Sequence, residues 1–205
     1  DQRHGFQKRI FPEVSGYAVG GLTNTMKFER TSMEKSGPGR NHYLLYDRDC
    51  ATAARRYLEA FAYGASERPL CLVVGFVGPH CPFVCPEAEF ERYWEAVELQ
   101  DYAPEYLAGR HPYSRRYARR AGIDDLTAHE IRRTRAAYYG MVDFDDQQVG
   151  TILETLSETG LADDTVVIYT SDHGELAGEH GLWWKMSFYE GSAGVPLVVS
   201  WPGHF

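Results

Sequence analysis

Three short apolar runs, separated by polar or amphipathic stretches, dominate the pattern of the chain. They span residues 70–77, 166–171 and 195–201, and polar residues, glycine or proline follow each of them. Unbroken apolar and β-branched runs of this length predict strands that are buried on both faces, as in parallel sheets. The pattern therefore predicts a buried sheet built from these segments.

Helices are predicted between the runs. The first is expected over about 51–62, with Asp49 as its cap, and a short one over 87–97. The longest helix is expected to begin at a capping box in residues 127–130 and to end at Gly160. Its apolar face is expected at Val149, Ile152, Leu153 and Leu156.

The order strand, long helix, strand predicts a βαβ unit, and such a unit implies parallel pairing. The expected fold class is therefore α/β, with a largely parallel sheet flanked by helices. Residues 1–48 are rich in glycine and proline and are expected to make an irregular excursion over the sheet edge. Residues 49–205 are expected to form the α/β core, with a second irregular stretch over 100–125.

Composition narrows the class of partner. The chain has 205 residues and a formal net charge of −8, so it lacks the basic footprint that nucleic acids and anionic membranes require. No apolar stretch reaches the length of a membrane span, and the first residues do not resemble a signal peptide. A soluble protein is expected, and its compartment, cytoplasmic or periplasmic or secreted, stays open, as does its oligomeric state.

The four cysteines are Cys50, Cys71, Cys81 and Cys85. The last two follow His80, which raises the question of a zinc site. Their C-x₃-C spacing with interposed prolines matches structural zinc patterns poorly, so a zinc site is not favoured. Cys71 lies in an apolar run and is expected to be a small buried hydrophobic residue. Four cysteines in a chain of this size do not require disulfides.

The polar residues that follow the second apolar run are the clearest candidates for a catalytic or ligand-binding site. Asp172 and His173 come directly after it, where ligands bind in open α/β sheets. A carboxylate and an imidazole at this place can hold a cation. Twelve residues after His173, Lys185 supplies a positive charge for an anion. Together these groups indicate phosphoryl or sulfuryl transfer.

Residues 171–197 fill nearly every position of the motif S-D-H-G-x-x-x-G-E-H-G-x-W-x-K-x-x-x-[FY]-E-x-S-x-x-V-P-L. This segment resembles the sulfatase family of the alkaline phosphatase superfamily. The resemblance implies an alkaline-phosphatase/sulfatase-like fold in which Asp172 is a calcium ligand and His173 completes the shell. It further implies that Lys185 contacts the sulfate and stabilises charge in the transition state.

His80 lies in the segment Gly78-Pro79-His80-Cys81-Pro82-Phe83, just after the first run. Sulfatases place a histidine in a similar P-H-x-P-[FY] setting. The resemblance implies that His80 contacts the sulfate and protonates the leaving oxygen as a general acid. Many relatives carry Lys or His where this chain has Gly78, so one substrate contact is missing.

Other polar residues have structural interpretations. Glu179 and His180 are expected to fix the loop by hydrogen bonds. The acidic cluster of Asp143, Asp145 and Asp146 is expected to form a solvated, arginine-paired helix face.

The first residues, D-Q-R-H-G-F, resemble choline-sulfatase-like members, and the chain as a whole is similar to the choline-sulfatase and iduronate-sulfatase branches. Tyr17 falls near an aromatic position of a choline pocket, but the alignment there needs a gap. Choline is therefore not assigned as the substrate.

Parts of the family pattern are missing from the chain. The nucleophile of sulfatases is a formylglycine made from Cys or Ser in C-x-P-S-R, and no cysteine here precedes x-P-S-R. Residues 1–205 are therefore expected to be the central, incomplete part of a sulfatase catalytic domain, inactive alone. The expected function of the parent is calcium-assisted hydrolysis of a small-molecule sulfate ester. A phosphonate monoester or phosphodiester hydrolase and a degenerate, non-catalytic binding module are the alternatives.

Overall fold

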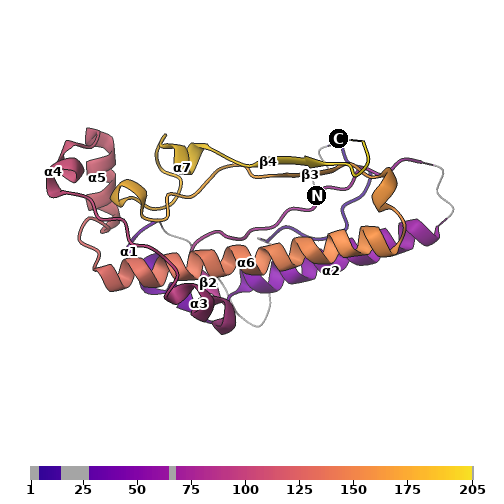
Figure 1. Ribbon diagram of the computed structural model, residues 1–205, viewed down its shortest axis with the longest axis horizontal. Coiled ribbons are helices and arrows are strands. Elements are labelled where there is room, and N and C mark those ends of the chain that lie inside the picture. Colours follow the sequence, from indigo (N-terminus) through magenta and orange to yellow (C-terminus); the bar gives the residue numbers. More distant parts are fainter. Residues whose placement is uncertain (1–4, 15–27, 65–67, 205) are drawn as a thin grey trace.

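The computed structural model describes residues 5–14, 28–64 and 68–204. Two long helices lie side by side and contact each other, and an antiparallel strand pair lies in a separate layer (Figure 1). The helices are α1 Arg30–Glu34, α2 His42–Tyr63, α3 Glu87–Trp94, α4 Pro104–Gly109, α5 Pro112–Ala121, α6 Ala128–Glu158 and α7 Glu190–Ala193, with short 3₁₀ turns at Ala162–Asp164 and Glu179–Gly181. The strands are β1 Gly37–Pro38, β2 Val84–Cys85, β3 Val167–Thr170 and β4 Leu197–Ser200.

Helix α6 begins and ends as its sequence predicts. Glu130 N donates to Thr127 Oγ1 at 3.2 Å and Thr127 N donates to Glu130 Oε2 at 2.8 Å, which forms the reciprocal capping box. At the other end Gly160 takes a φ of +72°, and Leu161 N donates to Leu156 O at 2.9 Å. The predicted apolar face is right for buried Leu156 and wrong for Leu153, which is exposed.

Helix α2 begins earlier than predicted. Its cap is Asn41, whose Oδ1 accepts from Leu44 N at 3.0 Å, so the expectation of a cap at Asp49 was wrong. The prediction of an irregular excursion over 1–48 was accordingly wrong for α1, β1 and the start of α2. The 100–125 stretch was also predicted irregular, yet it contains α4 and α5. Both begin at a proline, and the arginine-rich sequence of α5 has too few apolar residues for its period to be recognised.

The strand pairings differ from the predicted ones. Strands β1 and β2 pair in parallel, whereas β3 and β4, which form within two of the predicted strands, pair antiparallel with Val167 opposite Ser200. The predicted strand at 70–77 has no ladder partner within the described part of the chain. Its residues from Leu70 to Phe76 nevertheless alternate between half-buried and exposed, which is the period of a strand. The fold is an incomplete α/β domain with one parallel and one antiparallel strand pair among the described residues.

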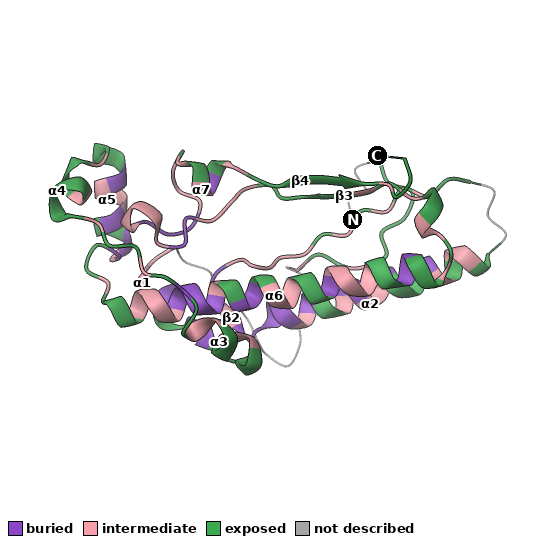
Figure 2. Ribbon diagram, viewed as in Figure 1, coloured by how far each residue is buried: buried purple, intermediate pink, exposed green. Residues whose placement is uncertain are grey.

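The hydrophobic core lies where the first half of α6, β2, α5 and the 176–184 segment meet (Figure 2). It includes Phe83, Met141, Trp183 and Trp184, all buried. Packing is tight at Gly140, where an added Cβ would lie 2.5 Å from Cys85 Sγ. Strands β3 and β4 remain exposed, as their green colour in Figure 2 shows. The core therefore supports the loops at one end of the strand pair.

Candidate functional site

The four residues that the sequence singled out lie close together. His173 is the centre: its Nε2 lies 2.6 Å from Lys185 Nζ and 3.6 Å from Asp172 Oδ1. The rings of His80 and His173 have their centroids 6.5 Å apart. His80, Asp172, His173 and Lys185 therefore form one polar cluster, called here the His80–Lys185 cluster, from segments about 90 residues apart.

Backbone carbonyls fix the tautomer of both histidines. His173 Nδ1 lies 2.8 Å from Gly174 O, and His80 Nδ1 lies 2.9 Å from Cys81 O. Because a carbonyl only accepts, each Nδ1 carries the hydrogen and each Nε2 keeps a lone pair. His173 Nε2 thus accepts from the Lys185 ammonium, and His80 Nε2 is left for a ligand.

Electrostatics at His80 favour the neutral imidazole. Burial lowers the pKa of His80 most, and the neighbouring Lys185 and His173 lower it further. The hydrogen bond to Cys81 O and the Asp172 carboxylate act in the opposite direction and raise it. The ring also packs against Phe28 and Tyr43, with centroids 5.9 and 6.1 Å away. His80 is therefore a half-enclosed base whose proton affinity depends on nearby charge.

A buried carboxylate holds the loop that carries Lys185. Glu175 Oε1 accepts from Ala177 N at 3.0 Å and from Trp184 N at 2.6 Å. Burial raises the pKa of Glu175 to about 7, against the opposing effect of these hydrogen bonds. Ala177 and Trp184 both have positive φ, so Glu175 ties together a strained loop. Sequence reasoning gave this task to Glu179 and His180 and missed Glu175.

His180 contributes to the same loop in a different way. Its ring stacks on Tyr189 with the centroids 4.0 Å apart, and its Nδ1 contacts the Tyr106 hydroxyl. The predicted hydrogen bond of His180 is present, and it joins the loop to α4. The Glu179 carboxylate lies against Gly191, where an added Cβ would be 2.7 Å from Oε2.

Asp47 supports the turn that carries His80. Its side chain is buried, and its oxygens accept from Val77 N and Gly78 N, each at 2.8 Å. Burial raises the pKa of Asp47 to about 6 despite these two hydrogen bonds. No pattern in the sequence indicated this role, because α2 was expected to begin beyond residue 47.

Asp145 lies on the other side of the same turn. Both of its carboxyl oxygens are buried and have no hydrogen-bond partner among the described residues. Burial, and then the charge of Asp47, raise the pKa of Asp145 to about 8. The prediction of a solvated acidic face was right for Asp143, which pairs with Arg92, and for exposed Asp146. It was wrong for Asp145, which points inward.

Gly78 is required by this packing. A Cβ on Gly78 would lie 2.1 Å from Asp145 Oδ2, whereas a Cβ on Gly75 would meet nothing within 4 Å. We expect Gly78→Ala to lower the free energy of unfolding by about 2 kcal/mol through overpacking. Chemical denaturation measures the change, with Gly75→Ala as the matched control. The loss should shrink in an Asp145→Ala background, and an equal loss in both backgrounds would contradict the contact.

The described residues do not complete a calcium site. Calcium takes six to eight oxygen ligands, and here Asp172 supplies one carboxylate, whose side chain is 86% exposed. The imidazole of His173 is already occupied by Lys185. Over residues 5–14, 28–64 and 68–204 no group of three His, Cys, Asp or Glu side chains is arranged to hold a metal ion. Any calcium would need ligands beyond these residues.

The cysteines near His80 are buried thiols. Burial raises the pKa of both Cys81 and Cys85 to about 12, so neither is a thiolate at neutral pH. His80 directs Nδ1 to a backbone carbonyl. Cys81 and Cys85 are therefore core residues, whereas Cys71, which was predicted to be buried, is exposed.

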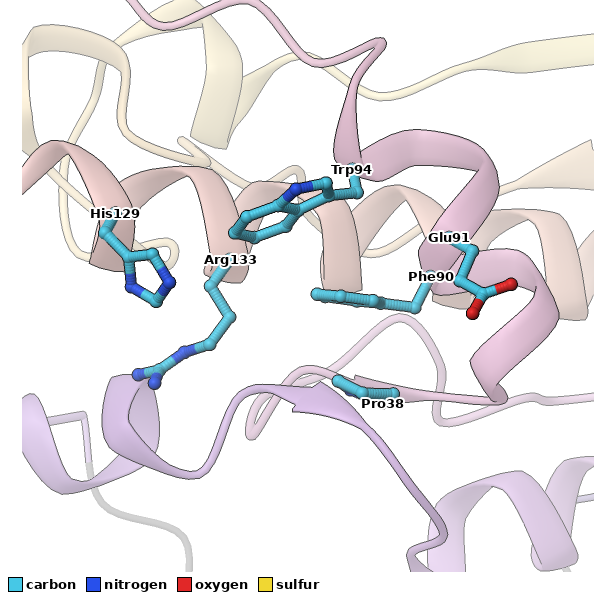
Figure 3. A pocket seen from close by; sticks show the side chains of 6 residues that line it. All are labelled: Pro38, Phe90, Glu91, Trp94, His129 and Arg133. Carbon is cyan, nitrogen blue, oxygen red and sulfur yellow. The ribbon is translucent and has the colours of Figure 1, made fainter.

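A hollow in the surface lies away from the His80–Lys185 cluster. It has a volume of about 370 Å³ and lies between α3, α6 and β1 (Figure 3). Its lining residues are Pro38, Phe90, Glu91, Trp94, His129 and Arg133. None of them belongs to the cluster, so this hollow is not part of the candidate site.

The motif match extends to the whole chain. The sequence profile of the family described as Sulfatase matches residues 2–205. The chain belongs to the sulfatase family.

Curated relatives of this sulfatase chain are longer than it is. Choline-sulfatase of Rhizobium meliloti (strain 1021) is 33% identical over 223 aligned residues, which cover 99% of this chain and 43% of that protein. Arylsulfatase K of Bos taurus is 37% identical over 155 residues, which cover 67% of this chain and 28% of that protein. The chain therefore spans less than half the length of these relatives.

Solved structures place the sulfatase chain in the same fold. The phosphonate monoester hydrolase of Agrobacterium radiobacter superposes with a TM-score of 0.62 and 30% identity, over 76% of this chain and 33% of that one. The phosphonate monoester hydrolase of Silicibacter pomeroyi has a TM-score of 0.59 and 27% identity over the same shares of the two chains. The fold is therefore alkaline-phosphatase/sulfatase-like and incomplete.

Neither of the long helices is a membrane-spanning candidate. Within the described residues, no helix combines the length and the apolarity needed to cross a bilayer. Residues 1–4 of the N-terminal motif and Tyr17 lie outside the described residues, so the choline-sulfatase-like match there stays a sequence observation.

Proposed function

We propose that the protein carrying this chain hydrolyses small-molecule sulfate esters, and that residues 1–205 are the central part of its catalytic domain. The observation that carries the proposal is the His80–Lys185 cluster. The Lys185 ammonium and the His80 imidazole both lie near His173, which follows β3, and His80 Nε2 has no hydrogen-bond partner among the described residues. Family membership and the choline-sulfatase and arylsulfatase K relatives support sulfate as the transferred group.

Lys185 and His80 have different roles toward the substrate. The Lys185 ammonium binds the sulfate oxygens and stabilises the charge that grows on them in the transition state. His80 binds the sulfate and, when protonated at Nε2, donates a proton to the leaving alkoxide oxygen. Burial and Lys185 keep His80 neutral in the free site, and the negative charge of a bound sulfate ester opposes this effect.

Asp172 and His173 are proposed as two ligands of a divalent cation, with calcium expected. To bind metal, His173 Nε2 has to give up its hydrogen bond with Lys185 Nζ, which frees the ammonium for the sulfate. The formylglycine nucleophile is expected from outside residues 1–205, because no cysteine here precedes x-P-S-R. The other metal ligands are expected from outside the described residues. When bound, the metal supplies a positive charge to the sulfate oxygens.

The competing activity is phosphonate monoester hydrolysis, which the structural similarity to the Agrobacterium radiobacter and Silicibacter pomeroyi enzymes favours. We expect the full-length protein to have a kcat/KM at least about tenfold higher for an aryl sulfate than for the matched aryl phosphonate, about 1.4 kcal/mol of discrimination. Parallel assays with calcium measure this ratio. A reversed ratio would favour the hydrolase of phosphonates, and tight binding of both esters without turnover would favour a degenerate binding module.

The pH dependence of kcat/KM reports on His80. Because the general acid must be protonated and its pKa is lowered, kcat/KM is expected to fall as pH rises through a value below the usual 6.5 or so of histidine. His80→Ala is expected to lower kcat/KM about 10²-fold and to remove this limb. His129→Ala, in the hollow of Figure 3, is the matched control. An unchanged pH profile in His80→Ala would rule out the acid role.

A further inference from the structure

Arg135 on α6 is buried without an acceptor. The residue is only 8% exposed, and its Nε and Nη1 atoms are sealed from solvent with no hydrogen-bond partner among the described residues. The nearest aromatic face, that of Tyr139, has its centroid 6.0 Å from the guanidinium carbon. These two nitrogens have no acceptor among the described residues, which is unfavourable for a buried guanidinium, and Nη2, which is not among the buried unpartnered atoms, is the nitrogen that remains for a ligand.

A cavity of about 180 Å³ adjoins this side chain. It lies between α4, the first half of α6 and the loop that carries Lys185, and Gly178, Gly181 and Trp183 of that loop line it. Arg135 and Arg110 also line it. The volume is below that of sites for drug-sized molecules and suits a ligand of a few heavy atoms.

Three residues that line this cavity carry N–H groups with no acceptor among the described residues. Arg110 uses Nε on Leu107 O at 2.9 Å and Nη1 on His180 O at 2.7 Å, which leaves its Nη2 available. In Arg135, Nη2 is the guanidinium nitrogen that is not among the solvent-inaccessible atoms without a partner. Gln100 lines the cavity as well, and its Oε1 accepts from the Tyr102 hydroxyl, so its amide N–H groups remain as donors.

Two carboxylates offset the positive charge of the arginines that line the cavity. Asp101 and Asp124 line it together with the two arginines, so the formal charge of these four side chains is zero. Asp124 raises the pKa of Arg110 electrostatically, against the larger lowering effect of burial. The cavity therefore offers N–H donors without a large positive field, so an oxyanion bound there is held by directed hydrogen bonds and not by net charge.

We propose that this cavity binds a small oxyanion, held by Arg135, Arg110 and Gln100. The site shares no residue with the His80–Lys185 cluster and does not depend on the proposed sulfatase activity. Guanidinium groups favour oxyanions because several N–H groups can donate to them at once. Since Gly178, Gly181 and Trp183 line the site, a bound oxyanion stabilises the loop that carries Lys185.

Thermal unfolding of the full-length protein with inorganic sulfate tests the site. The Lys185→Ala background removes sulfate binding by the His80–Lys185 cluster, and sodium chloride at matched ionic strength corrects for general salt effects. We expect a saturable rise in Tm of about 5 °C at a hundredfold excess over Kd, as for any ligand that binds only the folded state. Arg135→Gln should abolish the saturable part, whereas Arg120→Gln, on the exposed surface of α5, should leave it unchanged.

A linear, non-saturating rise in both proteins, or a saturable rise that Arg135→Gln leaves intact, would overturn the proposal. If Arg135→Gln does not fold, a crystal structure of the Lys185→Ala protein with selenate decides the question. An anomalous selenium peak within hydrogen-bond distance of Arg135 would support the site. A peak elsewhere, or none at a concentration that stabilises the protein, would refute it.

Discussion

Lys185→Ala is expected to lower kcat/KM of the full-length protein for a sulfate ester about 10³-fold. Its ammonium is the positive side chain of the His80–Lys185 cluster, 2.6 Å from His173 Nε2, and its charge is needed where charge grows on the transferred sulfate. Removing one preorganised electrostatic contact of this kind costs on the order of 10²–10³ in rate. Steady-state kinetics with an aryl sulfate and excess calcium measure the loss.

The matched control is Lys35→Ala, because Lys35 is an exposed lysine just after α1. It should leave kcat/KM within about twofold of the wild type, as is usual for isolated surface charges. Lys185→Ala should also keep a cooperative unfolding transition, since Glu175 and not Lys185 ties the loop together. Near-normal turnover in folded Lys185→Ala would remove this lysine from the mechanism.

Local sequence signals were sufficient for the elements whose ends are encoded by adjacent residues. The capping box at Thr127 and Glu130 and the stop at Gly160 depend on contacts within a few residues. The loop after β3 was predicted in a different way, from the family motif that it carries, and this motif located Asp172, His173 and Lys185. The sequence therefore identified the members of the cluster, and the structure adds their distances.

Strand pairing could not be predicted in the same way. A run such as 166–171 is apolar whichever strand lies beside it, so its pattern cannot choose between parallel and antiparallel partners. In the structure β3 pairs with β4 in the antiparallel sense, and 70–77 alternates in burial without a ladder partner among the described residues. Pairing is a property of distant segments, and local apolarity carries no information about it.

The supporting carboxylates were missed for a related reason. Charge in a sequence predicts exposure, and Asp145 stands between Phe144 and Asp146 in a helix whose other acids are solvated or paired. Only the fold brings Asp145 against Gly78 and near Asp47. The result is a pair of buried carboxyl groups on either side of the turn that presents His80.

Asp145→Asn is expected to stabilise the full-length protein at high pH and to flatten its pH dependence. The folded state keeps the Asp145 proton up to a pKa of about 8, whereas the unfolded chain releases it near the ordinary value of 3.8. This contribution to stability is complete below about pH 4 and disappears as pH rises through 8. Since Asp145 is largely but not wholly enclosed, we expect a loss of about 2 kcal/mol between pH 5 and 8 in the wild type.

Chemical denaturation at several pH values measures this loss in wild type, Asp145→Asn and Asp146→Asn. Asparagine is close in shape to aspartic acid and has no proton to release, so the Asp145→Asn curve should lose about 2 kcal/mol less than the wild type over that range. The exposed neighbour Asp146 should show the wild-type slope. Asp47 and Glu175, whose pKa values are raised to about 6 and about 7, leave a residual slope of the same sign in every variant. Identical slopes in wild type and Asp145→Asn would mean that the Asp145 carboxyl is solvated, and the packing against Gly78 would then have to differ from the one described.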